Sequence, residues 1–570
     1  MGILVGVRRL NRSVKTNISV RGRDGSRDHW WEHAVFYEVY PRSFQDSNDD
    51  GVGDLNGITS RLAYLNELGI DAIWLTPIYP SPGVDFGYDI SDYKAIDPEF
   101  GTMEDFDRLI GEAKRRKIRV IMDFVANHTS DRHPWFEESR SSRGNAKRHW
   151  YVWHDGKGPG EPPNNWQSWF GHSAWKFDEK TGQYYYHFFY PQQPDLNWRN
   201  RDVREAMFDV LRFWLHRGVD GFRLDAVTRL FEDPHLKDDP ILPGVNAYGD
   251  PNIAHKHTDN LPAMHEVLRE FREVISEFPG DPVLISESDE PNISELTKLY
   301  GAHHDEVQLP MDFQVADLNK MSASAFRELF GEVEHNAATG QPFIFFSNHD
   351  QPRQWDRYGD GVHNELIAKQ LAVLLMTTRV TPQMYYGEEI GMCTTPPTRK
   401  EEVRDPIGKL GWPKEKGRDG ERTPMQWDTS RNAGFTAGKP WLPVPESARE
   451  CNVSMEEKNP HSVLNFYKKL ISLRRSNPAL RGGKYGALNE NDEKLFSYLR
   501  RTEDGEHVIV VALNMSPERR TVKLEIESAG YAGTRLRTIL ASPRDGVKIK
   551  VGHEVELESY GALVAEIERR

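Results

Sequence analysis

Short runs of apolar, β-branched and aromatic residues alternate along the chain with longer segments in which apolar residues recur every three or four positions. From Trp30 onward eight such runs are typical of buried strands, and helical periodicity fills most of the intervals between them. Alternating strands and helices predict a parallel sheet, and eight repeats predict an α/β fold of the (β/α)8 TIM-barrel type. The expected strands are 34–40, 70–77, 118–125, 219–227, 282–287, 306–313, 342–350 and 382–386. The expected helices are 55–68, 103–116, 203–216, 261–278, 324–334 and 365–378.

Other segments interrupt or follow this pattern. The segment 126–198 holds seven of the 15 tryptophans, and its length and aromatic content predict a subdomain inserted after the third strand. The barrel would then comprise 29–125 and 199–475, with an excursion rich in Pro, Gly and charge at 391–445 and a last helix at 463–475. Beyond it, 476–570 is expected to be a C-terminal antiparallel β-sandwich domain, with strands at 495–500, 507–514, 521–526, 536–540, 554–557 and 562–567.

The first 28 residues differ from the rest. They carry seven basic residues against two acidic ones, and their apolar stretch at 3–7 is too short for the core of a signal peptide. We expect a disordered basic extension here. An arginine-rich transit peptide is the alternative interpretation.

Composition narrows the class of protein. The net charge of −14 argues against nucleic acid or an anionic membrane as the partner, because both require a basic surface. No apolar run approaches the length of about 18 residues that a membrane span requires. Two cysteines, Cys393 and Cys451, exclude a disulfide framework and a cysteine-based metal site. The sequence therefore predicts a cytoplasmic protein, a monomer or homodimer, that acts on small molecules.

Carboxylates mark the ends of four expected strands. In a barrel of this type reactive residues lie at the carboxyl ends of strands. Those ends carry Asp123, Asp225, Glu287 and the pair His349-Asp350. Helix capping or simple solvation could explain one or two acids, but four on strand ends predict a single acidic site at the barrel mouth.

Paired carboxylates without a cofactor motif point to glycoside hydrolysis, in which one acid protonates the leaving oxygen and another attacks the sugar or activates water. Arg223 lies two residues before Asp225, so both side chains face the same side of a strand. A guanidinium there would lower the pKa of Asp225 and favour it as nucleophile. Glu287 leaves an apolar strand with no cation beside it in sequence, which suits a raised pKa and a general-acid role.

Four segments carry a family resemblance. DFVANHTS (123–130), GFRLDAV (221–227), ISES (285–288) and FFSNHD (345–350) resemble, in order and spacing, the main motifs of the α-amylase family of glycoside hydrolases. QPDLN (193–197), ERTPMQWD (421–428) and NAGFT (432–436) resemble its α-glucosidase and oligo-1,6-glucosidase branch. The resemblance extends from about residue 30 to the end of the chain.

The resemblance implies a retaining mechanism and a role for each matching residue. Asp225 would be the nucleophile, Glu287 the acid/base, and Asp350 the third carboxylate, which holds two sugar hydroxyls. An acid at the non-reducing end would pair with an arginine, close the pocket and enforce exo action. The residues implied to bind substrate are Tyr88, Asp89, His128, Arg223, Ala226, His349 and Arg422, with Asp89 and Arg422 as the closing pair.

An acidic loop follows the first strand. DSNDDGVGD (46–54) offers side-chain oxygens at Asp46, Asn48, Asp50 and Asp54 and a carbonyl at Val52, a spacing close to the first nine positions of a calcium loop. The bidentate Glu that ends an EF-hand is missing. The family branch carries a structural Ca²⁺ or Mg²⁺ in this loop, and the alternative is an acidic surface turn. No organic cofactor is expected.

The residue after the expected nucleophile bears on linkage. In relatives Val at this position goes with α-1,6 preference and smaller or polar residues with α-1,4, and this chain has Ala226. The expectation is an α-glucosidase that releases terminal α-1,4-linked glucose from maltose and short oligosaccharides. Ser288-Asp289 and the segment QWDRYGDG (354–361) depart from the common pattern, so α-1,6 cleavage, action on sucrose and transglucosylation stay open.

A non-catalytic, partner-binding function is the remaining alternative. Amino-acid transporter heavy chains share this fold and bind partners without catalysis, but they carry a membrane span and lack a full catalytic set. Here every catalytic position is filled. A binding protein of the same fold is therefore the remote alternative.

Overall fold

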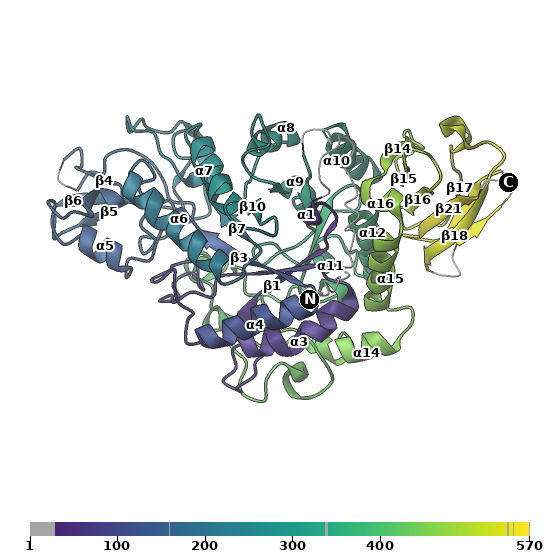
Figure 1. The fold of residues 1–570 in the computed structure, drawn as a ribbon, viewed down its shortest axis with the longest axis horizontal. Helices are drawn as coiled ribbons and strands as arrows, with labels where there is room; N and C mark the ends of the chain where they lie inside the picture. Colours follow the sequence, from purple (N-terminus) through teal and green to yellow (C-terminus); the bar gives the residue numbers. More distant parts are fainter. Residues whose placement is uncertain (1–28, 159, 337–339, 544–546, 551, 569–570) are drawn as a thin grey trace, which may run out of the picture.

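A computed structural model describes residues 29–158, 160–336, 340–543, 547–550 and 552–568. The basic segment 1–28 lies outside the described residues, so the expectation of a disordered extension is untested. Eight parallel strands close into a barrel in the order β1-β13-β12-β11-β10-β7-β3-β2, which confirms the (β/α)8 prediction (Figure 1). They are β1 (Phe36–Val39), β2 (Ala72–Leu75), β3 (Arg119–Val125), β7 (Gly221–Asp225), β10 (Val283–Ser286), β11 (Leu309–Asp312), β12 (Phe343–Ile344) and β13 (Thr381–Tyr385).

Alternate residues of these strands fill the barrel interior. One buried apolar cluster takes every second strand residue, for example Trp74 on β2, Ile285 on β10 and Met311 on β11. The residues between them, such as Ile73 and Leu284, belong to the cluster that packs against the helices. This period of two places Arg223 and Asp225 on the same side of β7 as Gly221, which is the inner side.

Amphipathic helices surround the barrel, and all six predicted ones are present. Helix α3 begins at its N-cap Asp54, whose side chain accepts from Gly57 N–H, and it ends at Gly69 in the left-handed region with φ 100°. The main helices are α3 (Leu55–Leu68), α4 (Met103–Arg115), α6 (Arg201–His216), α7 (Met264–Ser276), α10 (Ala323–His335), α12 (Asn364–Thr377) and α15 (Val463–Ser476). Shorter helices are α1 (Trp30–His33), α2 (Pro41–Phe44), α5 (Pro134–Ser139), α8 (Ile293–Leu296), α9 (Phe313–Ala316), α11 (Gln354–Arg357), α13 (Pro406–Gly411), α14 (Val453–Lys458) and α16 (Pro478–Gly482).

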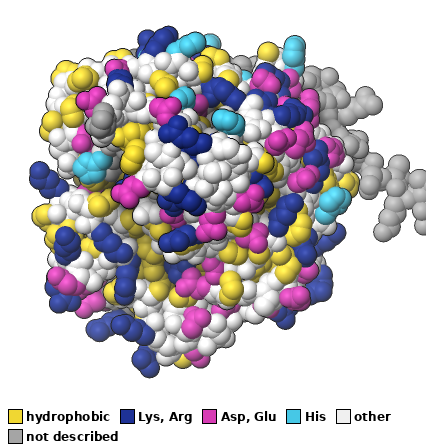
Figure 2. Space-filling model, turned by 90° about the vertical axis from the view of Figure 1, so that its left-hand side faces the viewer, with side chains coloured by type: hydrophobic (Ala, Val, Ile, Leu, Met, Phe, Trp, Pro, Cys, Tyr) yellow, Lys and Arg dark blue, Asp and Glu magenta, His cyan; other side chains and the backbone are white. Residues whose placement is uncertain are grey.

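The aromatic insertion has a core of its own. Strands β4 (Trp153–His154), β5 (Trp175–Asp178) and β6 (Gln183–Tyr186) form a small antiparallel sheet in the order β4-β6-β5. Trp166, Trp175 and Tyr186 pack in a separate buried cluster beside it. Many tryptophans of the insertion are thus structural. On this side of the molecule Figure 2 shows acidic and basic side chains interspersed, with no single basic patch.

A second hairpin and the C-terminal strands complete the chain. The hairpin, β8 (Ile241–Val245) with β9 (Pro251–Ile253), lies between β7 and α7 and was not predicted. The C-terminal part has a five-stranded sheet, β14-β15-β16-β21-β18, and a three-stranded sheet, β17-β20-β19, at the end of the molecule away from the insertion (Figure 1). These strands are β14 (Lys484–Leu488), β15 (Leu495–Arg501), β16 (Val508–Asn514), β17 (Arg520–Lys523), β18 (Arg535–Ser542), β19 (Val547–Ile549), β20 (Glu554–Leu557) and β21 (Ala562–Glu568).

The two C-terminal sheets share one apolar core. Leu499 and Val510 of the larger sheet belong to the same buried cluster as Val522 and Val555 of the smaller one. The six predicted strands are all present, and β14 and β19 were missed. Among the described residues no helix combines the length and the apolar character needed to cross a membrane.

Candidate active site

The strand-end carboxylates meet at one mouth of the barrel. Asp225 is the last residue of β7, and Glu287 and Asp350 follow β10 and β12. Asp123 lies on β3 directly opposite Arg223 of β7 in the register of the sheet. Hydrogen bonds and ion pairs connect all four acids to a few shared arginines, so the predicted acidic site exists.

Arg223 is the cation around which three of these acids lie. Its side chain is fully buried, and Nη1 lies 2.6 Å from Asp225 Oδ1 and 3.0 Å from Asp123 Oδ1. Its Nη2 lies 2.8 Å from Glu287 Oε1. The guanidinium also lies 5.0 Å from the centre of the Trp74 ring. One positive charge therefore faces three carboxyl groups, which disfavours ionisation of all three at once.

The electrostatics of Asp225 differ from the sequence expectation. Burial raises the pKa of Asp225 well above 3.8, and Arg223 offsets this only in part, while Glu287 and Asp123 raise it further. Burial likewise raises the pKa of Asp123 to about 6, although Arg223 opposes the rise. Arg223 lowers the pKa of Asp225 as predicted, but the low net pKa expected from this pairing was wrong. That expectation ignored burial and two neighbouring carboxyls that arrive from other strands.

The expectation for Glu287 also changes. In sequence it has no cation beside it, but the fold places Arg223 against it at 2.8 Å. Its side chain is 23% exposed, against 9% for Asp225, so it is the more accessible of the two. The sequence predicted that a neighbouring cation would distinguish Asp225 from Glu287. In the structure Arg223 contacts both acids, and they differ in solvent exposure instead.

Ala226 joins the two acids through its backbone. Its N–H donates to Glu287 Oε2 at 3.0 Å. The residue adopts the left-handed region with φ 47°, which is uncommon for a residue other than glycine. A strained residue directly after the expected nucleophile thus aims one N–H at the expected acid/base.

Asp350 is held by two arginines of the excursion. Its Oδ1 accepts from Arg422 Nη2 at 2.6 Å and from Arg418 Nη1 at 2.8 Å, and His349 Nε2 lies 3.3 Å from Oδ2. Burial acts to raise the pKa of Asp350, but His349, Arg418 and Arg422 outweigh it and hold the pKa well below its usual range. Asp350 is therefore an ionised acceptor.

The expected pairing of Asp89 with Arg422 is not present. Asp89 accepts from Ser81 Oγ and from the N–H groups of Val84 and Asp85, and burial raises its pKa to about 6. It makes no pair with Arg422. The prediction of an Asp89–Arg422 pair was wrong, because Asp89 supports the backbone of its own loop.

A different acid–arginine pair lies beside Asp350. Arg418 Nη2 contacts Asp85 Oδ1 at 2.8 Å, and its Nε contacts Asp405 Oδ2 at 2.9 Å. Through its Nη1 the same guanidinium reaches Asp350. Three acids therefore surround Arg418. Its contact with Asp85 links the loop after β2 to the excursion after β13, which contains Arg418 and Asp405.

Tyr88, His128 and His349 lie together as expected. The rings of Tyr88 and His349 stack with centroids 5.5 Å apart, and Tyr88 Oη lies 2.7 Å from His349 Nε2. His128 is buried, with Nε2 3.1 Å from the Tyr88 carbonyl and 3.0 Å from Gln193 Nε2. Burial lowers its pKa to about 3, so this histidine is neutral.

Some residues of the site were missed in the sequence. Gln193, in the segment QPDLN, also donates to Asp85 at 3.2 Å, and Glu38 on β1 contacts His349. Arg418 lies only four residues before Arg422, and local sequence gives no reason to choose between them. The missed residues are Glu38, Asp85, Gln193, Asp405 and Arg418.

The acidic loop is wound around its own carboxylates. Both oxygens of Asp46 accept N–H groups, from Asn48, Asp49 and Gly51 at 2.8 to 2.9 Å. Asn48 and Asp50 each accept from the residue two positions on, the latter from Val52 N–H. Asp54 caps α3 through Gly57 N–H at 2.7 Å.

The donor chemistry of this loop fits a hard cation, because every candidate ligand is an oxygen and an ionised carboxylate retains further lone pairs. The part of the chain that the structure describes contains no group of three His, Cys, Asp or Glu side chains placed as metal ligands. Amide and carbonyl oxygens of Asn48 and Val52 would therefore have to complete the set.

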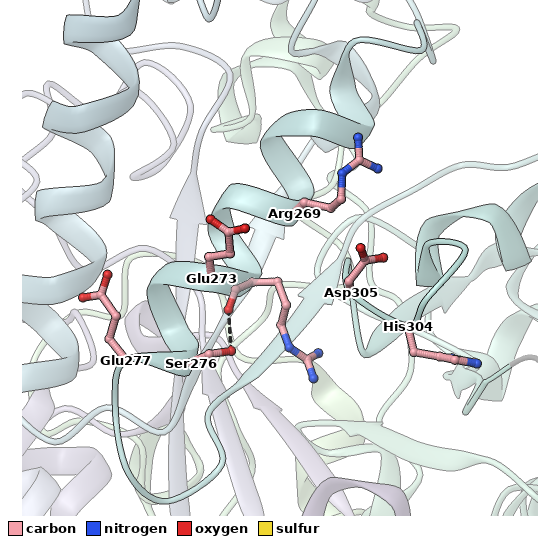
Figure 3. Close-up of a pocket in the computed structure, with 7 residues that line it drawn as sticks. Arg269, Glu273, Ser276, Glu277, His304 and Asp305 are labelled. Atoms are coloured by element: carbon pink, nitrogen blue, oxygen red, sulfur yellow. Dashed lines mark hydrogen bonds between the residues drawn. The ribbon is translucent and has the colours of Figure 1, made fainter.

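Two surface cavities lie apart from these acids. One of about 530 Å³ is lined by α7 and the segment before β11, including Arg269, Arg272 and His304 (Figure 3). The other, of about 510 Å³, lies between α6 and the insertion and includes Trp135 and Trp150. None of the strand-end carboxylates lines either cavity.

A closed barrel with acids at its mouth fits the glycoside hydrolysis expected from the sequence, and comparison with known proteins identifies the family. The description "Alpha amylase, catalytic domain" matches residues 38–483. The chain therefore belongs to the α-amylase family of glycoside hydrolases.

Named relatives span nearly the whole chain. A probable α-glucosidase of Rhizobium meliloti is 42% identical over 94% of this chain and 97% of its own length. An oligo-1,6-glucosidase of Parageobacillus thermoglucosidasius is 40% identical over 94% of this chain and 99% of its own length. An isomaltulose synthase of Erwinia rhapontici, solved with sucrose, is 37% identical, with a TM-score of 0.87 over 95% of this chain and 100% of that one.

Proposed function

We propose that this enzyme is a retaining, exo-acting α-glucosidase that removes terminal α-1,4-linked glucose from maltose and short oligosaccharides, with transglucosylation as a side reaction. The observation that carries the proposal is the contact of one buried guanidinium, Arg223, with both Asp225 and Glu287. Because both acids touch the same group, they lie close together, as a covalent double displacement requires.

In the first step Asp225 attacks the anomeric carbon and the glycosidic bond breaks, while Glu287 gives its proton to the leaving oxygen. The product of this step is a β-glucosyl ester on Asp225. In the second step Glu287 removes a proton from water, or from a sugar hydroxyl in transfer, and the ester bond breaks. The Ala226 N–H holds the Glu287 carboxyl against the nucleophile strand throughout.

The remaining residues would bind and orient the sugar. Asp350 is ionised and can accept two sugar hydroxyls, His349 lies beside it, and Tyr88 contacts both His349 and His128. The Asp85–Arg418 pair would close the non-reducing end. A charged pair there leaves no room for a further sugar, which accounts for exo action.

The pH dependence tests the state of Asp225. The nucleophile must be ionised, and its pKa is raised well above 3.8 by burial. As pH falls through this pKa the acid gains a proton and attack stops, so we expect the acid limb of kcat/KM to lie well above pH 3.8. The measurement is kcat/KM for p-nitrophenyl α-glucoside against pH. A plateau that continues below the ordinary pKa of an aspartate would contradict the raised value.

Linkage preference depends on the space beside the second sugar. Ala226 is small and 8% exposed at the mouth. We expect the wild-type enzyme to cleave maltose with a higher kcat/KM than isomaltose, and we expect Ala226→Val to lower the maltose value by roughly 10-fold. A β-branched side chain at φ 47° is also more strained than alanine, so we expect Ala226→Val to be less stable than the wild type.

The control for this substitution is Ala226→Gly, which keeps the space and relieves the strain. A panel of maltose, isomaltose, sucrose, trehalose and kojibiose, with separated products, completes the measurement. Dominant cleavage of isomaltose by the wild-type enzyme would overturn the α-1,4 proposal.

A second candidate function is supported by the names of the relatives. An oligo-1,6-glucosidase is 40% identical and an isomaltulose synthase is 37% identical to this chain. Either activity could use the same pair of acids, because both would break a glucosidic bond by the same double displacement. The substrate panel separates them: an oligo-1,6-glucosidase releases glucose from isomaltose, and a sucrose isomerase converts sucrose to another disaccharide.

We further propose that the loop from Asp46 to Asp54 binds one Ca²⁺ or Mg²⁺. When bound, the ion would offset the negative charge of the loop, and Asp46, Asn48, Asp50, Val52 and Asp54 would hold it. Asp54 also caps α3, so binding would stabilise that helix start. We expect EDTA to lower the melting temperature by several degrees and Ca²⁺ to restore it. The variant Asp50→Asn, which lacks one of these carboxylates, should respond less to EDTA and Ca²⁺. A wild-type melting temperature that neither EDTA nor Ca²⁺ changes, as in Asp50→Asn, would contradict the proposal.

A further inference from the structure

Glu38 is a buried acid without a place in the reaction described so far. It lies on β1, two residues after Phe36 and on the same inner side of the strand. Its side chain is 0% exposed. A carboxyl group buried at this depth is costly unless it is hydrogen-bonded or neutral.

Each oxygen of Glu38 has a partner. Oε1 lies 2.6 Å from His349 Nδ1, and Oε2 accepts from Gln383 Nε2 at 2.8 Å. The backbone N–H of His349 also points at Oε1, at 3.3 Å. On its other side the imidazole contacts Tyr88 Oη at 2.7 Å through Nε2. Glu38 thus lies behind His349 on the side opposite Tyr88.

The hydrogens available in this series of hydrogen bonds determine which groups donate and which accept. Tyr88 has one hydroxyl hydrogen, which it donates to Asp123 Oδ2 at 3.1 Å. His349 Nε2 also lies 3.3 Å from Oδ2 of Asp350, whose pKa is held well below its usual range, and an ionised carboxylate can only accept. The contact between Tyr88 Oη and His349 Nε2 therefore needs a hydrogen on Nε2. A neutral imidazole has only one N–H, so Nδ1 is an acceptor and the hydrogen in its contact with Glu38 belongs to Glu38.

The surroundings of Glu38 and His349 favour a neutral acid beside a neutral imidazole over a carboxylate beside an imidazolium. Burial lowers the pKa of His349 well below 6.5. The charge of Asp350 raises this pKa, whereas the arginines Arg422, Arg223 and Arg418 lower it further. Burial raises the pKa of Glu38 well above 4.5; Arg223 opposes this, and Asp350 and Asp123 add to it. From β13, the neutral phenol of Tyr385 also faces Glu38, and its proton is retained because burial raises its pKa. A neutral acid beside a neutral imidazole is the state with the least buried charge.

We propose that Glu38 is a positioning residue: a buried, neutral carboxylic acid that donates to His349 Nδ1 and fixes the tautomer in which Nε2–H faces Tyr88, Asp350 and the sugar. A donor at Nε2 suits a site where Asp350 and the substrate hydroxyls offer acceptors. The kinetic consequence rests on the proposed glucosidase function, but the tautomer itself does not.

Two variants of Glu38 test the kinetic consequence. Glu38→Leu cannot donate to Nδ1, and we expect kcat to fall on the order of 10- to 100-fold. Glu38→Gln can donate its amide N–H to Nδ1 and still accept from Gln383, so it should restore most of the lost kcat. A variant Glu38→Gln as slow as Glu38→Leu, with an unchanged melting temperature, would argue against the proposal.

The pH profile distinguishes a neutral Glu38 from an ionised one. Replacing a neutral acid by a neutral amide leaves the field at Asp225 and Asp123 unchanged, so the acid limb of kcat/KM should stay where it is in the wild type. Removing a negative charge would instead lower the pKa of these neighbours and move the limb to lower pH. Such a shift would overturn the proposal.

A direct measurement on the wild-type protein depends neither on activity nor on the folding of the Glu38 variants. ¹⁵N NMR of histidine-labelled wild-type protein reports the tautomer, and His349→Gln assigns the signal by its loss. We expect the proton of His349 on Nε2. A proton on Nδ1, or an imidazolium, would overturn the proposal, whereas an unexpected substrate specificity would leave this result untouched.

Discussion

Replacement of Asp225 by Asn is expected to lower kcat/KM for maltose by about 10⁴-fold or more, because the amide cannot form the glycosyl ester. Asn is nearly isosteric, so the fold and the contact with Arg223 can be retained. The measurement is glucose release under single-turnover conditions, with circular dichroism to show that the variant is folded. Asp209→Asn, an exposed site on α6, is the matched control and should keep wild-type activity.

A residual activity of Asp225→Asn within 10-fold of wild type, in a preparation free of wild-type enzyme, would remove Asp225 from the mechanism. Asp350 would then be the next candidate. Its pKa is held far below the usual range by the arginines of the excursion, which makes it a poor nucleophile but a strong acceptor. The arrangement of charge therefore favours Asp225.

The second large loss of activity is expected for Glu287→Gln. This substitution removes the general acid, so we expect kcat for maltose to fall by about 10³-fold. The amide oxygen can still accept from the Ala226 N–H, so the geometry of the site can persist. An aryl glucoside with a good leaving group needs little protonation, and its first step should be spared.

The kinetic signature separates a chemical role of Glu287 from a structural one. With an activated aryl glucoside we expect a burst of released phenol followed by slow turnover, since the second step still needs a base. Equal losses for maltose and for the aryl glucoside, without a burst, would indicate damage to the site. Glu273→Gln, on the exposed side of α7, is the matched control.

The sequence was sufficient for the barrel because its strands are continuous apolar runs and its helices are strongly amphipathic. Strand lengths were overestimated: the expected strand 342–350 is only β12, Phe343–Ile344, and the residues after it form the loop that carries His349 and Asp350. The hydrogen bonding between strands stops where the polar site residues begin, whereas the residue pattern alone predicts that the strand continues. The hairpin β8–β9 was missed because Pro243 and Gly244 break the strand pattern.

The identity of the site acids was accessible from sequence, but their partners were not. Asp225, Glu287 and Asp350 meet as predicted, because strand ends of a barrel converge. Arg418 and Arg422 both come from the excursion after β13, and only the folded chain shows that both reach Asp350. The expectation of a low pKa for Asp225, drawn from its neighbour Arg223, failed because burial dominates and carboxyl groups on other strands add to the rise.

The most direct test of the account is to trap the covalent intermediate. Incubation with 5-fluoro-α-D-glucosyl fluoride, whose second step is slow, should load the enzyme with one glucosyl group, and mass spectrometry of the peptides should place it on Asp225. An adduct on Asp350 or Glu287 would contradict the assignment of the nucleophile. Turnover of this substrate with no covalent adduct, and release of the inverted sugar, would contradict the retaining mechanism itself.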